Sequence, residues 1–280
     1  MKKRLFGITS SAAAAASFCA LTLGAGLMPA VAHADSYIDM LNAMGGNPAE
    51  FNAAAGEKLW NEKRGPNHVS LKQCDLGLGP GVLKGAYAQL PRYFPDTGKV
   101  QDVESRIVTC MEKLQGFTPE QIAKEVTKNP FDKKGGNATD IVNMAVYVAH
   151  QSDGMPMEVP QNTPQEKLSF ENGKKFFWYR AGPYNFSCAT CHSENGKQIK
   201  ISKLPNLVSP DGEKAWVAAT WPAYPDSQGV VRTLEWRMND CMRQQRIAEP
   251  KYLSQVVIDL ETYMGIMAKG HKILTPSFKR

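Results

Sequence analysis

The residues best suited to chemistry in this sequence lie at positions 187–193, which contain the pentapeptide Cys188-Ala189-Thr190-Cys191-His192. Two thiols three positions apart can add to the two vinyl groups of a haem, and the adjacent histidine can then bind the iron. We therefore interpret Cys188 and Cys191 as the covalent attachment residues of one haem c. His192 would be an axial ligand of its iron.

Two other kinds of site use the same pair of thiols, namely a redox-active disulfide and half of a zinc site. A zinc site needs a second pair of ligands at a suitable spacing. Outside the N-terminal leader the remaining cysteines are solitary: Cys74, Cys110 and Cys241. A thioredoxin-like pair needs a strand, a turn and a helix around it, whereas the flanks here read as helical on one side and loop-rich on the other. The pattern favours haem.

The N-terminal segment predicts export. Lys2, Lys3 and Arg4 precede a small and apolar stretch, and Ala32-His33-Ala34 matches a small-x-small cleavage site, so residues 1–34 have the pattern of a signal peptide. No other stretch has the roughly 18 consecutive apolar residues that a membrane span needs. We expect a mature chain that is soluble and, in a bacterium, periplasmic.

The charge balance argues against a nucleic-acid or membrane-surface partner. The formal net charge of +6 falls to +3 when the leader is removed, because three basic residues and no acidic ones leave with it. That excess is too small to indicate a polyanionic partner.

Two halves of the chain resemble each other. The segment 56–66, with Gly, Lys, a bulky apolar pair and Gly-Pro, recurs at 173–183 with the same spacing. Further on, seven residues recur at a constant offset of 131 positions, pairing Pro91, Tyr93, Gly98, Glu104, Arg106, Cys110 and Met111 with Pro222, Tyr224, Gly229, Glu235, Arg237, Cys241 and Met242. We interpret this as an internal duplication. It predicts an all-α protein of two tandem cytochrome c-like domains, with a haem-free domain at 35–154, a linker at 155–164 and a haem-binding domain at 165–280.

Helix signals support this division. Asn47-Pro48 predicts the start of a helix that runs to about Arg64, and a capping box of Thr163 and Glu166 starts the equivalent helix. Each half then closes with an amphipathic helix. The expected buried faces are Ile141, Val142, Ala145 and Val148, after Asn137 or Thr139 as cap, and Leu253, Val256, Val257, Leu260, Met264 and Met267. Met155, Pro156, Pro160 and Pro164 mark the linker.

The first half has no Cys-x-x-Cys-His motif, although Cys74 lies in the corresponding region and Cys110 matches Cys241. If both domains fold alike, Cys74 and Cys110 face the same pocket. We therefore predict that they form a disulfide where a haem would have been. Two unpaired buried thiols are the alternative, which an oxidising compartment disfavours.

Cys241 is the favoured second axial ligand of the haem. A class I cytochrome c takes this ligand from a segment after the haem motif, and it is usually a methionine. The candidates are Met238, Met242, Met264 and Met267. Met264 and Met267 lie on the apolar face of the last helix, and Met242 has a counterpart in the half without haem, so packing explains these three. A plain electron-transfer cytochrome with His/Met ligation stays the alternative. The lone histidines His68, His150 and His271 are read as structural or surface residues.

Arg237 precedes Cys241 by four residues and would share its helix face. A guanidinium there would favour the thiolate and attract an anionic substrate. Arg106 occupies the matching place in the other half, so structural Glu-x-Arg pairs, Glu104 with Arg106 and Glu235 with Arg237, are the alternative. Further positive charge near this segment comes from Arg232, Arg243 and Arg246.

Several motifs resemble SoxA, the larger subunit family of the SoxXA cytochromes of bacterial thiosulfate oxidation. They are Cys74-Asp75-x-Gly-x-Gly-Pro-Gly, Leu90-Pro91-Arg92-Tyr93-Phe94, Cys188-x-x-Cys191-His192 and Arg237-Met238-Asn239-x-Cys241, and the resemblance covers essentially the whole mature chain. Some SoxA proteins carry two haems; this sequence lacks the first motif and looks like the single-haem form.

The resemblance implies a reaction and partners. The sulfane sulfur of thiosulfate would be coupled to a cysteine of the carrier SoxYZ, giving a cysteine S-thiosulfonate, while electrons leave through haem to an acceptor cytochrome c. It implies a heterodimer with the small cytochrome SoxX. It also implies that Cys241 is both a haem ligand and, after modification, a catalytic cysteine persulfide, with Arg237 beside it.

Overall fold

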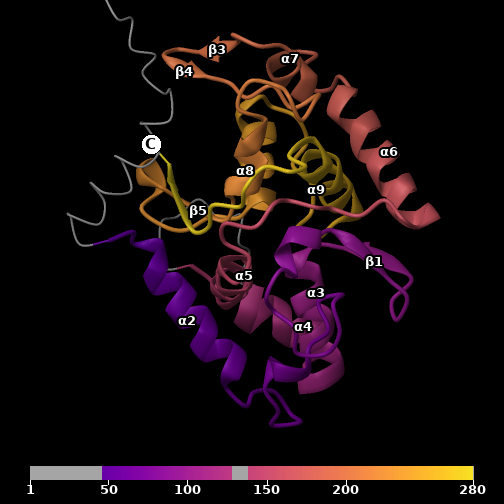
Figure 1. Ribbon diagram of the computed structural model, residues 1–280, viewed down its shortest axis with the longest axis vertical. Coiled ribbons are helices and arrows are strands. Elements are labelled where there is room, and N and C mark those ends of the chain that lie inside the picture. Colours follow the sequence, from indigo (N-terminus) through magenta and orange to yellow (C-terminus); the bar gives the residue numbers. More distant parts are fainter. Residues whose placement is uncertain (1–45, 128–137, 280) are drawn as a thin grey trace, which may run out of the picture. The chain divides into compact units, whose positions relative to one another are not determined.

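The computed structural model describes residues 46–127 and 138–279, which are mostly helical with a few short strands (Figure 1). The predicted signal peptide and Asn137, one of two candidate helix caps, lie outside the described residues. Within these two ranges, none of the helices has the length and apolar character of a membrane-spanning segment.

The first domain is built from short helices around two long ones. Its elements are α2 (Ala49–Asn61), the 3-10 turns η1 (Leu71–Gln73) and η2 (Tyr87–Gln89), β1 (Arg92–Phe94), β2 (Lys99–Gln101), α3 (Val103–Cys110), the π-helical segment η3 (Met111–Gln115), α4 (Pro119–Gln121), a second π-helical segment η4 (Ile122–Thr127) and α5 (Asp140–His150). Thr139 begins α5 in an extended conformation, as one of the two predicted caps, without a hydrogen bond from its side chain.

The second domain shares the long first and last helices of this order and differs in the short elements between them. Its elements are α6 (Pro164–Trp178), α7 (Cys188–His192), β3 (Gln198–Ile199), β4 (Ser202–Lys203), the 3-10 helix η5 (Ala215–Thr220), β5 (Ala223–Pro225), the 3-10 turn η6 (Asp226–Gln228), α8 (Leu234–Gln244), α9 (Gln255–Met267) and β6 (Ser277–Lys279). Figure 1 shows α6 in salmon pink near α8 in orange and α9 in yellow. The predicted capping box starts α6, since Thr163 and Glu166 exchange hydrogen bonds.

The same close helix crossing holds each domain together. In the first, Gly56 of α2 meets α5 so closely that an added Cβ would overlap the backbone oxygen of Asn143. In the second, Gly173 of α6 meets the backbone oxygen of Asp259 in α9 in the same way. Glycine is needed at both positions because the two backbones leave no room for a side chain.

The duplication is confirmed by elements that recur at the predicted offset of 131 residues. Strands β1 and β2 are antiparallel and pair Arg92 with Gln101, and 131 residues later Ala223 and Arg232 form an equivalent antiparallel bridge. Helices α3 and α8 begin at Val103 and Leu234, which differ by the same offset. In the second domain β5 also pairs in parallel with the C-terminal strand β6.

Three sequence expectations need correction. Helix α2 ends at Asn61 rather than near Arg64, and Pro48 takes the cap position while the Asn47 side chain accepts a hydrogen bond from the Ala49 N–H. Helix α9 begins only at Gln255, so Leu253 lies before it.

The third correction concerns the buried face of α9. Val256, which the apolar spacing placed in the core, is 40% exposed, while Ile258 and Tyr263 are buried instead. Val257, Leu260, Met264 and Met267 are buried as predicted, while Leu253 belongs to the preceding turn, where its φ is 57°.

The segment expected to be a linker lies outside the helices and strands except for Pro164, which begins α6, and it is packed against the protein. Met157 and Val159 are buried in the second core. Backbone hydrogen bonds join Met157 to His271 and Glu158 to Ala88. It therefore holds the domains together rather than separating them.

Each domain has its own core, and polar contacts join them. One core gathers around Trp60, Leu71, Ile107 and Ile141, and the other around Phe177, Leu260, Tyr263 and Ile273. The Tyr87 hydroxyl donates to the Trp221 carbonyl at 2.7 Å, and the Tyr93 N–H donates to Glu166 Oε1 at 3.0 Å.

Candidate functional site

Helix α7 is a single short turn that carries the Cys-x-x-Cys-His motif. Ser187 begins it with a capping box, in which the Ser187 side chain accepts from the Thr190 N–H and the Thr190 side chain accepts from the Ser187 N–H. Because the backbone is helical here, Cys188 and Cys191 lie on neighbouring positions of one face, as thiols attached to a single haem must.

His192 is oriented for metal binding through one particular nitrogen. Its Nδ1 lies 2.9 Å from the carbonyl oxygen of Pro205. A carbonyl can only accept, so Nδ1 carries the proton and Nε2 is left with a lone pair, which is the usual second-sphere arrangement of a ligating histidine. Burial lowers the pKa of His192, and the charge of Arg237 lowers it further, against the hydrogen bond to Pro205. The imidazole is therefore neutral and available as a ligand.

Helix α8 brings Cys241 close to the motif cysteines. Burial raises the pKa of the Cys241 thiol, Arg237 lowers it, and Asp240 and Cys191 raise it again. Burial, with the negative charge of Cys241 as the next cause, raises the pKa of Cys188 to about 12. The thiols from α7 and α8 thus lie within electrostatic range of one another.

This donor set fits a haem c. Two thiols stand at the attachment spacing, one imidazole presents a free Nε2, and a further half-buried sulfur, Cys241, comes from α8. The four methionines considered as alternative ligands, Met238, Met242, Met264 and Met267, are all buried members of the second core. Of the lone histidines, His150 and His271 lie within hydrogen-bond distance of the carbonyls of Thr275 and Pro210.

Arg237 and Arg106 occupy equivalent positions but have different surroundings. The Arg106 side chain is 6% exposed, donates to the Asp75 carbonyl and to Asp96, and stacks on Phe94 at 3.9 Å. The Arg237 side chain is 41% exposed and contacts Asp240 at 3.3 Å. The alternative of Glu-x-Arg pairs is wrong, because Glu104 accepts from Tyr252 and Glu235 from the Leu253 N–H.

The other arginines near this segment are engaged or lie at the surface. Arg243 pairs with Asp240 at 2.5 Å, and Arg232 is buried over the ring of Trp236 at 4.6 Å. Arg246 is exposed. Arg237 is therefore the arginine best placed to meet a solute near Cys241.

Two residues of this region were missed by the sequence analysis. Asp240 holds Arg237, Arg243 and Gln244 together. Lys279, in the C-terminal strand β6, donates to Thr220 Oγ1 at 2.6 Å, and burial, with the charge of Arg237, lowers its pKa to about 8. No motif marks a lysine next to the C-terminus, so only tertiary contacts could reveal it.

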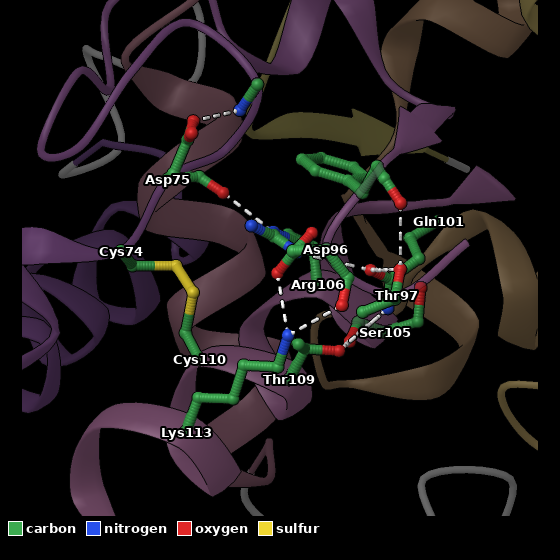
Figure 2. Close-up of polar contacts among 12 residues, drawn as sticks. Cys74, Asp75, Asp96, Thr97, Gln101, Ser105, Arg106, Thr109, Cys110 and Lys113 are labelled. Atoms are coloured by element: carbon green, nitrogen blue, oxygen red, sulfur yellow. Dashed lines mark hydrogen bonds and ion pairs between the residues drawn. A yellow bond between two sulfur atoms is a disulfide. The ribbon is translucent and has the colours of Figure 1, made fainter. Parts of the chain in front are cut away.

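In the first domain a disulfide joins Cys74 and Cys110, the two residues paired in the sequence analysis (Figure 2). In this region the two halves of the chain match at an offset of 117 residues, as the equivalent β-bridges Arg64–Val69 and Ala181–Phe186 show. At this offset Cys74 corresponds to Cys191, and Asp75 corresponds to His192. Figure 2 shows Arg106 between Asp75 and Asp96, with Lys113 on the far side of Asp96. Cross-linked sulfurs and an ion-pair network thus replace the haem-binding residues.

Comparison with known proteins agrees with these features. The family model for the SoxA/TsdA cytochrome c domain matches the chain twice, at residues 55–157 and 172–273. A relative from Hydrogenophilus thermoluteolus, named L-cysteine S-thiosulfotransferase subunit SoxA, is 47% identical over 84% of this chain and 84% of its own. The chain belongs to the SoxA family.

Two further matches are consistent with this membership. A SoxA relative from Hydrogenobacter thermophilus is 34% identical over 86% of this chain and 85% of its own. A crystal structure of SoxXA from P. pantotrophus aligns with a TM-score of 0.68 at 23% identity, covering 86% of this chain and 84% of that one. At this identity the structural match supports the fold, two tandem cytochrome c domains.

Proposed function

We propose that this chain is the SoxA subunit of a periplasmic L-cysteine S-thiosulfotransferase. A cysteine thiol of the carrier SoxYZ would lose its proton and form a sulfur–sulfur bond with the sulfane sulfur of thiosulfate. The products are a cysteine S-thiosulfonate, one proton and two electrons, and the electrons pass to an acceptor cytochrome c. The names of the SoxA relatives support the reaction, and the likeness to SoxXA supports SoxX as the partner subunit.

One haem c would be held by Cys188 and Cys191, with His192 and Cys241 as axial ligands of its iron. When bound, the haem supplies one-electron transfer toward the acceptor. A thiolate ligand is a strong donor and favours a low reduction potential, in contrast to a methionine. Substrate binding and sulfur transfer would depend on this chain's own side chains.

Cys241 would accept or relay sulfur, and carries it as a persulfide. Arg237 would bind the thiosulfate anion, since a half-exposed guanidinium one helical turn away can donate two hydrogen bonds to sulfonate oxygens. Asp240 would position Arg237, and the nearby Lys279 would add positive charge. The observation that carries this assignment is the contrast between Arg237 and Arg106: the arginine in the haem-free domain is fully engaged in structure, while its counterpart beside Cys241 reaches solvent.

The alternative function is electron transfer through a haem ligated by His192 and a methionine. A Cys241→Met variant separates the two functions, because it keeps a sulfur donor for the iron but removes the thiol. We expect it to retain its haem, gain the weak far-red absorption of His/Met ligation, and lose SoxYZ labelling by at least about 100-fold, the scale of losing a nucleophile.

The measurement is mass spectrometry of the carrier cysteine after incubation of SoxXA and SoxYZ with thiosulfate and oxidised cytochrome c. A Cys74→Ala/Cys110→Ala double variant is the control, since it alters sulfurs outside the site and should label SoxYZ normally. Non-reducing peptide mapping of the unaltered chain should show one extra sulfur atom on Cys241. Normal labelling by Cys241→Met would exclude catalysis by Cys241. Absence of labelling by the unaltered complex would leave electron transfer as the function.

A further inference from the structure

A group of buried carboxylates lies where the two domains meet, away from the haem motif. Asp102 and Glu104 stand at the start of α3, Glu235 at the start of α8, and Glu261 in α9. Asp102, Glu104 and Glu235 are at most 1% exposed, and Glu261 is 9% exposed. Glu104 and Glu235 are equivalent positions of the duplication, so the group forms where the same surfaces of the two repeats face each other.

The carboxylates converge on one point. Oxygen atoms from Asp102, Glu104 and Glu235 all lie within 4.8 Å of one another. Two oxygens that bind the same Ca²⁺ ion, each at about 2.3–2.6 Å, are separated by no more than about 5 Å. One cation could therefore contact all three carboxylates without a rearrangement of the helices.

Two oxygens in this group accept no hydrogen bond from any described residue outside it, although the carboxyl group of Glu261 lies within hydrogen-bond reach of Asp102. They are Asp102 Oδ2 and Glu235 Oε1, whereas Asp102 Oδ1 accepts from Ser105 and Glu235 Oε2 accepts from the Leu253 N–H. A cavity of about 20 Å³ is bordered by Asp102 and Glu261 of this group, but not by Glu104 or Glu235. That volume suits a single ion or water molecule. Unpartnered buried oxygens beside such a space indicate a ligand, because an unpaired buried carboxylate is costly.

No basic side chain compensates the charge. In the part of the chain that the structure describes, no lysine, arginine or histidine forms an ion pair with any of the four carboxylates. The nearest arginine in sequence, Arg106, pairs with Asp96 instead. The hydroxyl of Tyr252 donates to Glu104, which satisfies one oxygen but adds no positive charge.

We propose that Asp102, Glu104 and Glu235, with Glu261 beside them, bind one Ca²⁺ ion that ties the two domains together. The donors are all carboxylate oxygens, which favours a hard cation over zinc or copper. Mg²⁺ is disfavoured because its bonds of about 2.0–2.1 Å hold two oxygens no more than about 4.2 Å apart, whereas the three carboxylate oxygens here are separated by up to 4.8 Å. The ion would fix the start of α8, only two residues before Arg237, and thereby position the helix that carries Cys241.

The alternative to a bound Ca²⁺ ion is that the carboxylates are protonated and share protons with one another. Burial, with the charge of Asp102 as the next cause, raises the pKa of Glu104 to about 8. Protons on these groups would also relieve the repulsion. The two occupants differ in one measurable respect, since only the cation makes stability depend on free Ca²⁺.

The test uses the haem-loaded SoxXA complex. After dialysis against EDTA and removal of the chelator, equilibrium dialysis with radioactive Ca²⁺ should show one site per chain. Millimolar Ca²⁺ should raise the Tm by several degrees at pH 8, and equal Mg²⁺ should not. Glu235→Gln should weaken Ca²⁺ binding at least about 10-fold, the usual scale for losing a metal-site partner. The exposed Glu112→Gln is the matched control and should bind normally.

The binding measurement on the unaltered complex keeps the test valid if Glu235→Gln fails to fold. Absence of stoichiometric Ca²⁺ binding, together with a Tm that depends on pH but not on Ca²⁺ or EDTA, would assign the group to shared protons and overturn the proposal. Equal Ca²⁺ binding by the Glu235→Gln and Glu112→Gln complexes would place the ion elsewhere and also overturn it.

Discussion

Arg106 and Arg237 occupy equivalent positions of the duplication but have different structural surroundings. Both lie four positions before a cysteine, on helices that begin at equivalent places. Arg106 is inserted between Asp75 and Asp96 beside a disulfide, while Arg237 keeps its guanidinium at the surface. The difference arises because Asp75 and Asp96 both contact Arg106, whereas among the described residues the only ion-pair partner of Arg237 is Asp240, three residues along its own helix.

The two arginines should therefore respond differently to substitution. Arg237→Gln should lower kcat/KM for thiosulfate by about 10–100-fold, chiefly through KM, and change the unfolding free energy by less than about 0.5 kcal/mol, as for an exposed side chain. Arg106→Gln should reduce the unfolding free energy by about 2–3 kcal/mol, because it removes a buried charge from its partners. Its kcat/KM per folded molecule should stay unchanged.

Steady-state kinetics and denaturant unfolding of the two variants check this pair. A destabilised Arg237→Gln with unaltered kcat/KM would show that this arginine is structural, like its counterpart.

Among the helices, the crossings of α2 with α5 and of α6 with α9 position the rest of each domain. Gly56 and Gly173 let the paired backbones touch, so each crossing holds the turn that leads into η1 or α7. The position of the haem motif thus depends on a glycine that performs no chemistry.

Replacing either glycine by alanine should force the helices apart. We expect Gly56→Ala and Gly173→Ala each to lower the unfolding free energy by about 2–3 kcal/mol, the cost of overpacking a rigid contact. Only Gly173→Ala should also reduce haem incorporation, because only its domain carries the motif. Thermal unfolding and haem absorbance of the purified chain measure both effects.

The exposed neighbours Glu57→Ala and Lys174→Ala, one residue along each helix, serve as controls and should change neither quantity. Unaltered stability of both glycine variants would contradict the crossing geometry.

At the scale of the whole molecule, Glu166 connects the domains. Its carboxylate accepts hydrogen bonds from the N–H groups of Tyr93, Asn162 and Thr163. Burial alone would raise the pKa of Glu166, but these hydrogen bonds outweigh it and lower the pKa below 4.5. A carboxyl group whose folded-state pKa is depressed stabilises the protein above its unfolded pKa, and this contribution is lost as the pH falls through the folded pKa.

Glu166→Gln should therefore be less stable than the unaltered chain at pH 7 by about 1–2 kcal/mol, the scale of a hydrogen bond to a charged group. The difference should shrink as the pH falls below the unfolded pKa of a glutamate, about 4.3, and should be lost once the pH is below the depressed folded pKa. Denaturant unfolding from pH 3 to pH 7 measures it, with the exposed Glu171→Gln on the same helix as control. A difference that stays constant over this range would show that the charge of Glu166 has no part in joining the domains.

The sequence by itself determined the features that depend on local chemistry or on repetition. The spacing of Cys188, Cys191 and His192 indicates haem attachment because the two vinyl groups fix the distance between thiols. The offset of 131 residues predicted two similar domains, and the pairing of Cys74 with Cys110 followed from their equivalence to haem-site positions. The capping box at Thr163 was also predictable from the sequence, because it depends on only four consecutive residues.

The tertiary structure decided which partners each charged side chain meets. The Glu-x-Arg pairs failed because neighbours in sequence point to different surroundings on a helix, so Arg106 meets Asp96 while Glu104 meets Tyr252. The limits of α9 were misread because an apolar residue in a turn has the same hydropathy as one in a helix. Lys279 near Arg237, and the carboxylates between the domains, come from segments far apart in sequence. Only tertiary packing brings these residues together, because neither burial nor long-range electrostatic interactions leave a local pattern in the sequence.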